Sequence, residues 1–178
     1  MDNFYWSKKF IIINFLLWVC LVTFSPSLQT KEAGSESNNV IQKANMIIVW
    51  KSSRKMSLFY NKTLLKSYRI RLGFNPIGHK VKEGDGRTPE GRYFITHHNP
   101  KSKYHLSLGI NYPNQKDRIN AKKRGVDPGG DIYIHGASQN IFRHIFTDWT
   151  GGCIAVHDHE IEEIYRSVSD GTVIYIYG

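Results

Sequence analysis

The sequence predicts a mainly β domain with appended helices. Its hydrophobic content of 40% and aromatic content of 13% suit a packed core and not a disordered chain. Short stretches rich in β-branched and aromatic residues recur along the chain, several of them alternating with period two. Apolar residues at helical spacing are confined to a few segments. The length of 178 residues suits one such domain plus a tail.

Seven segments carry the strand pattern and three the helix pattern. The expected strands cover residues 46–51, 57–60, 65–72, 92–97, 105–112, 131–135 and 172–177. The expected helices cover residues 115–124, 138–146 and 158–168, the last with Asp158 as its N-cap. Residues 73–91 form a long loop rich in glycine, and loops of that length in a compact domain are usually functional.

The N-terminal segment differs in character from the rest. Two lysines precede an apolar stretch at residues 10–24, which is short for a bilayer span and typical of a signal peptide. We therefore expect residues 1–27 to be a signal peptide, with an uncleaved inner-membrane anchor at residues 10–24 as the alternative. Either interpretation predicts export to the periplasm or cell envelope. Residues 28–44 are polar and small, as in a linker, and leave residues 45–178 as the folded domain.

The chain is basic, with a net charge of +9, or about +8 without residues 1–27. A basic surface suits an anionic partner such as nucleic acid, a membrane face or an acidic polymer. Export argues against nucleic acid as the partner. Contact with a membrane is expected only through the N-terminal segment.

Cys153 is the only cysteine beyond residue 27, and it follows Gly151 and Gly152 directly. It therefore has no intramolecular disulfide partner, which leaves a buried structural residue, a metal ligand or a nucleophile. None of the usual zinc-ligand spacings is present, so no metal is expected. As a nucleophile it needs a base such as His135, and flanking glycines would leave amides free for an oxyanion.

Two motifs give the chain a family resemblance. His135-Gly136, followed at the family's spacing by Thr150-Gly151-Gly152-Cys153, resembles the signature of the L,D-transpeptidase (YkuD-like) catalytic domain. The loop at residues 83–91, EGDGRTPEG, resembles that family's second motif. The resemblance covers residues 46–177 and implies a β-sandwich domain. The form DWTxGCIAV around the cysteine indicates a sub-branch of the family.

The resemblance implies a role for each matching residue. Cys153 would be the acyl-forming nucleophile and His135 its general base, with the Gly136 carbonyl orienting the imidazole. The Gly152 amide would contribute to an oxyanion hole. The substrates implied are peptidoglycan stem peptides, cleaved between an L-centre and a D-residue and then passed to an amine, with no cofactor. Substrate binding is expected from four residues: Tyr112, Arg87, Thr150 and Gly151. A core position for Tyr112 is an equally good interpretation.

Two departures from the family pattern leave the acyl acceptor open. Gly151 stands where many members have a histidine, and Ala155 stands where many have Asn or Arg. Water as acceptor would make the protein an L,D-carboxypeptidase, or an amidase that detaches a wall-linked protein. A non-catalytic wall-binding module is the alternative outside enzymes.

Overall fold

The structure is a computed structural model that describes residues 43–137 and 148–178. The expected signal peptide and the expected helix at residues 138–146 lie outside these ranges. The strands are β1 (Ala44–Trp50), β2 (Lys55–Tyr60), β3 (Thr63–Arg69), β4 (Gly91–Ser102), β5 (His105–Ile110), β6 (Tyr133–His135), β7 (Ile154–Ala155) and β8 (Val168–Tyr177). The helices are α1 (Gln115–Lys123) and α3 (Asp158–Ser167). A mainly β domain with appended helices is therefore confirmed.

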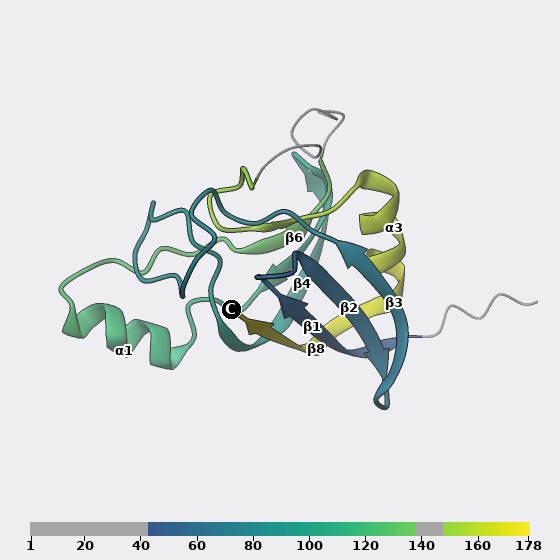
Figure 1. The fold of residues 1–178 in the computed structure, drawn as a ribbon, viewed down its shortest axis with the longest axis horizontal. Helices are drawn as coiled ribbons and strands as arrows, with labels where there is room; N and C mark the ends of the chain where they lie inside the picture. The colour runs from purple at the N-terminus through teal and green to yellow at the C-terminus, as the bar shows by residue number, and fades with distance from the viewer. Residues whose placement is uncertain (1–42, 138–147) are drawn as a thin grey trace, which may run out of the picture. The chain divides into compact units, whose positions relative to one another are not determined.

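All eight strands belong to one curled sheet, in the order β3-β2-β1-β8-β4-β5-β6-β7 (Figure 1). The twelve-residue strand β4 joins its two halves. Residues 91–94 of β4 pair with β8, and the rest of the strand, from Ile95 to Ser102, pairs with β5. One strand thus links the half that carries β1 to the half that carries β6 and β7.

The centre of the sheet is a parallel pair made by the first and the last strand. Ile47 of β1 lies opposite Ile174 of β8, and Val49 lies opposite Ile176. These four side chains are at most 1% exposed, whereas their neighbours in the chain are less buried. This alternation is the period-two pattern expected for a sheet with one face on the core.

Several boundaries differ from those predicted. β4 runs on past His97 through Ser102, because His98 and Asn99 continue the ladder to β5 despite their polarity. Asp158 is not the N-cap of α3 but its first residue. His157 takes the cap position, and its N–H donates to the carboxylate of Glu160. Asp158 instead accepts a bond from Ala137, as described below.

The two helices lie at opposite ends of the view in Figure 1. α3 packs against β5, β6 and β8 through buried Ile161 and Ile164. α1 is capped by Asn114, whose side chain accepts a bond from the Asp117 N–H. Among the described residues, neither helix is long and apolar enough to span a bilayer.

Candidate active site

The pairing of two short strands places the predicted nucleophile and base on one edge of the sheet. β6 and β7 run parallel, with Ile134 opposite Ile154 and His135 opposite Ala155. Cys153 directly precedes β7, so this register sets it alongside the residues of β6. Residues 18 positions apart in the chain are thereby brought to one site by two strand ends.

Cys153 and His135 line one cavity of about 460 Å³. Its walls come from β6, from Cys153 and from the β4–β5 hairpin. The ten residues that line it are Asn99, Lys101, Ser102, Lys103, Tyr104, Ser107, Asp131, Tyr133, His135 and Cys153. The hairpin therefore forms a large part of this site, although no motif in the sequence predicted this role.

His135 is buried and oriented by the backbone. Its side chain is 2% exposed, and its Nδ1 lies 2.6 Å from the carbonyl oxygen of Gly136. Because a carbonyl only accepts, Nδ1 carries the proton, and Nε2 of the neutral ring keeps its lone pair. Burial lowers the pKa of His135, although the Gly136 carbonyl and the charge of Asp158 oppose this shift. The resting imidazole is neutral.

Two aromatic rings pack around this imidazole. The ring of Tyr104 stacks on that of His135, with centroids 4.4 Å apart and planes 26° apart. Trp149 meets His135 edge-on at 5.7 Å and Tyr104 at 5.8 Å. Sequence reasoning missed both. Trp149 lies close to Cys153 in the motif, a signal that was available, whereas nothing in the sequence ties Tyr104 to His135.

Cys153 is partly exposed to the cavity, while its thiol is held between backbone groups. Sγ donates to the carbonyl oxygen of Asp131 at 3.4 Å. Burial raises the pKa of the Cys153 thiol, and the backbone N–H of Tyr133 acts in the opposite direction. The raised pKa of the thiol and the lowered pKa of the imidazole both favour the neutral forms of the two groups at rest.

The turn before the nucleophile is held by Thr150. Its hydroxyl donates to the Cys153 carbonyl at 2.7 Å and accepts from the Gly152 N–H at 3.1 Å. Thr150 is 3% exposed, so it shapes the turn from within. The Gly152 amide, which the family resemblance assigns to an oxyanion hole, donates within the turn to Thr150 in this structure.

The two glycines before Cys153 have different roles. Gly152 has a φ of +139°, and a Cβ there would lie 2.7 Å from the carbonyl oxygen of Arg87. Only glycine meets both conditions without strain. Gly151 is exposed, and a Cβ there would meet no atom within 4 Å. A side chain at position 151 thus has room, whereas one at position 152 has none.

Gly136 is a third position where the backbone is closely approached. A Cβ there would lie 2.5 Å from Asp158 Oδ1 and 2.8 Å from the carbonyl oxygen of Tyr104. Asp158 Oδ1 also accepts from the Ala137 N–H at 2.6 Å. The start of α3, the hairpin and the segment after His135 therefore meet at this glycine.

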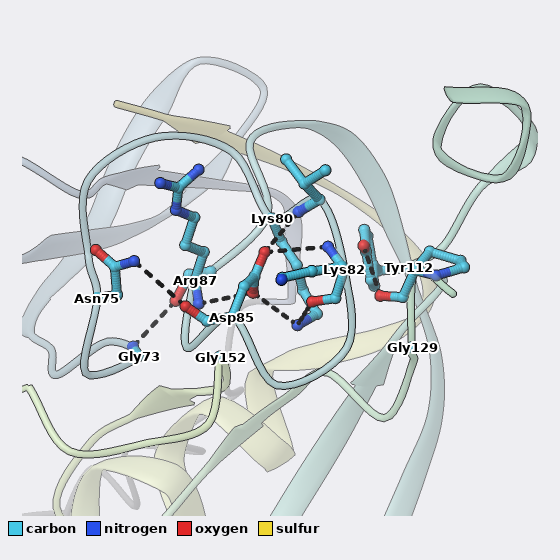
Figure 2. A network of polar contacts seen from close by, with 12 residues as sticks. Gly73, Asn75, Lys80, Lys82, Asp85, Arg87, Tyr112, Gly129 and Gly152 are labelled. Atoms are coloured by element: carbon cyan, nitrogen blue, oxygen red, sulfur yellow. Dashed lines mark hydrogen bonds and ion pairs between the residues drawn. The ribbon is translucent and has the colours of Figure 1, made fainter. Parts of the chain in front are cut away.

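The EGDGRTPEG loop packs against the cysteine turn, residues 150–153, at Gly152 (Figure 2). Asp85 sits at its centre and accepts from the backbone N–H groups of Val81, Lys82 and Arg87, and from Lys80 Nζ at 3.0 Å. Burial alone would raise the pKa of Asp85, but these hydrogen bonds outweigh it and lower the pKa. The bonded carboxylate fixes the loop whose Arg87 carbonyl abuts Gly152.

Two of the predicted substrate-binding side chains lie away from the cavity. Tyr112 is 5% exposed, belongs to the hydrophobic core, and donates from its hydroxyl to the Pro128 carbonyl at 3.0 Å. The Arg87 guanidinium lies toward Gly78, with Nη1 3.7 Å from where a Cβ would be. Figure 2 shows the Arg87 side chain directed away from the labelled Gly152. Arg87 supports the site through its backbone.

Comparison with known proteins agrees with this geometry. The sequence matches the YkuD family, the L,D-transpeptidase catalytic domain, over residues 44–176. The chain belongs to this family. The match includes the cysteine turn, the histidine strand and the supporting loop.

Individual relatives are more distant. YafK of Escherichia coli (strain K12), whose name places it with the L,D-transpeptidases, is 25% identical over 93% of this chain. The helical cell shape determining protein Pgp2 of Campylobacter jejuni shares the fold, with a TM-score of 0.61, 23% identity and 76% of this chain covered. An L,D-transpeptidase of Mycobacterium smegmatis also shares the fold, with a TM-score of 0.52, 14% identity and 76% of this chain covered. The chain spans 66% of the length of YafK, 48% of the Pgp2 chain and 59% of the M. smegmatis chain.

Proposed function

We propose that the protein is a peptidoglycan L,D-transpeptidase that acts on stem peptides through a Cys153 acyl-enzyme. One observation carries the proposal: Cys153 and His135 line the same cavity, with the imidazole turned so that Nε2 is its basic nitrogen. Family membership supports peptidoglycan as the substrate. We further propose that the chain works in the cell envelope, as its relatedness to L,D-transpeptidases suggests.

The first step is attack by sulfur with simultaneous loss of its proton. Since both groups are neutral at rest, His135 Nε2 takes the proton of Cys153 as Sγ bonds to the carbonyl carbon of the L-centre. The carbonyl oxygen becomes an oxyanion. Thr150 holds the Gly152 amide, so we assign stabilisation of this oxyanion to the Cys153 amide.

The second step breaks the peptide bond. The tetrahedral intermediate expels the D-residue as its amine, which takes the proton from the His135 imidazolium, and a thioester to Cys153 remains. An acceptor amine then gives a proton to His135 Nε2 and attacks the thioester. Cys153 leaves as thiolate and regains its proton, which completes a cross-link. Water in place of the amine gives a shortened peptide.

The deciding experiment is incubation with a disaccharide-tetrapeptide, followed by mass analysis of products and protein. We expect an acyl adduct on Cys153 and a cross-linked dimer. Cys153→Ala should lose both while keeping its melting temperature, and retained turnover in that variant would sink the assignment. A shortened monomer without dimer would instead identify a hydrolase.

A control tests His135 separately. His135→Ala should slow acylation at every pH at which the wild-type base is neutral, whereas an unchanged profile would remove it as the base. An unreactive Cys153 together with salt-sensitive binding to sacculi would favour the wall-binding module.

A further inference from the structure

The turn of the β4–β5 hairpin brings two lysines to the rim of the cavity that holds the nucleophile. Lys101 and Lys103 both line this cavity, on the same hairpin as Tyr104, which stacks on His135. The backbone that carries them is therefore fixed close to the predicted base.

Among the described residues that line the cavity, the charge balance is positive. The charged groups that line it are two ammonium groups, those of Lys101 and Lys103, and one carboxylate, that of Asp131. The lowered pKa of His135 favours its neutral form. Within the described residues no ion pair reaches either lysine, and both side chains are exposed. Lys51 and Lys80, by contrast, are buried and paired with Glu90 and Asp85.

We propose that Lys101 and Lys103 form an anion subsite that binds a carboxylate of the donor substrate next to the bond that Cys153 attacks. The ligand class is a peptide with a free carboxylate near its scissile bond. That the peptide is a stem peptide rests on the proposed function, whereas the subsite itself does not. Each exposed pair of an ammonium and a carboxylate is weak, so the two lysines together should favour an anion about threefold to tenfold.

Two small alkylating reagents test the subsite without any peptide. Iodoacetate and iodoacetamide both react with the Cys153 thiolate, forming the S–C bond and releasing iodide, and they differ chiefly in the carboxylate. Because both use the same thiolate, the ratio of their second-order rate constants cancels effects on the Cys153 pKa. Rates are read by mass spectrometry on the peptide that contains Cys153, so that Cys20 does not contribute.

The double variant Lys101→Gln/Lys103→Gln is compared with Lys122→Gln/Lys123→Gln, which removes the same charge from the end of α1. We expect the iodoacetate-to-iodoacetamide ratio to fall threefold to tenfold in the hairpin variant and to stay near wild type in the control. The wild-type preference should also shrink in about 0.5 M salt, since exposed charges are screened. An unchanged ratio in the hairpin variant, or an equal fall in both variants, would overturn the subsite.

Stem peptides with a free or an amidated carboxylate then separate this inference from the proposed function. The hairpin variant should raise KM for the free carboxylate about threefold to tenfold and leave kcat and the amidated peptide unaffected. A fallen alkylation ratio without turnover of any stem peptide by wild type would uphold the subsite and defeat the proposed function. If wild type turns over stem peptides, but the hairpin variant keeps both the wild-type alkylation ratio and the wild-type KM, the proposed function would be upheld and the subsite defeated.

Discussion

Gly152 and Gly151 form a matched pair of positions for testing the cysteine turn. Replacing Gly152 by alanine puts a Cβ 2.7 Å from the Arg87 carbonyl oxygen and 3.2 Å from Ile132, at a φ of +139°. Replacing Gly151 puts one into open space. The two substitutions add the same methyl group one residue apart, so their difference reports the local backbone conformation and packing.

The magnitude follows from two costs. A non-glycine residue in this part of backbone space costs about 1–3 kcal/mol. Forcing the methyl against the Arg87 backbone adds about 1–3 kcal/mol, because a backbone oxygen moves less readily than the end of a side chain. We expect Gly152→Ala to lower the free energy of unfolding by about 3 kcal/mol, or the melting temperature by about 6–12 °C. Gly151→Ala should be neutral, or stabilise by up to about 1 kcal/mol.

Thermal and urea unfolding of the two variants and wild type measures both quantities. Alkylation of Cys153 in the same samples shows whether the nucleophile is displaced, and we expect a slower rate only for Gly152→Ala. Equal melting temperatures for the two alanine variants would refute the packing of Gly152 against Arg87. A Gly151→His variant should also fold, since position 151 is open, and its products with stem peptides would show whether a histidine there changes the acyl acceptor.

Four further outcomes are expected. Thr150→Val should destabilise by about 2 kcal/mol in urea unfolding, because two backbone groups lose their partner, while Thr150→Ser should keep wild-type stability. The rate of Cys153 alkylation should rise with pH through an inflection above that of a free thiol, since its pKa is raised; a plateau reaching below pH ~6 would contradict this. Tyr104→Leu should move the pH dependence of acylation that reflects His135 to lower pH by less than about one unit, because the stacked ring favours imidazolium, and Tyr104→Phe should restore it. Asp85→Asn should destabilise by about 1–3 kcal/mol at neutral pH. The lowered pKa of Asp85 gives stability that is present above pH ~4 and lost as pH falls through that pKa, so wild type and variant should converge in acid.

The sequence carried more information about the strands than about the site that they build. Ile47 and Ile174 lie in stretches whose alternation predicts strands, and both are buried in the central pair. Periodicity did not reveal that β4 extends through His98, because the partly buried imidazole bonds to the carbonyl groups of Tyr165 and Val168, which are distant in the chain. Strand existence follows from side-chain pattern, whereas strand ends depend on partners distant in the chain.

For the site, motif spacing singled out Cys153 and His135, which line one cavity, but not the hairpin that walls it. Tyr104 stacks on His135 through a contact that depends on how two strands pair, and a single sequence contains no signal for it. Tyr112 was given two equally good interpretations, and its buried position in the core fits the structural one. The bond from Gly152 to Thr150 depends on turn geometry that residue types do not determine.

The parallel pair of β1 and β8 also constrains the order in which the domain is assembled. A nascent chain that has exposed β1 through β7 still lacks the strand that pairs with both β1 and β4. Until β8 is added, Ile47 and Val49 have no partner on that side, and the ladders that join β1 to β8 and β8 to β4 are missing. The hydrogen bonds between residues 71–74 and residues 150–155 still connect the two groups of strands, but they lie outside these ladders. Contacts of such long sequence separation favour slow, late closure of the sheet. Cutting the chain before β8 should therefore abolish acyl-enzyme formation even though Cys153 and His135 are both retained, because the fold that aligns them is completed by residues far from either.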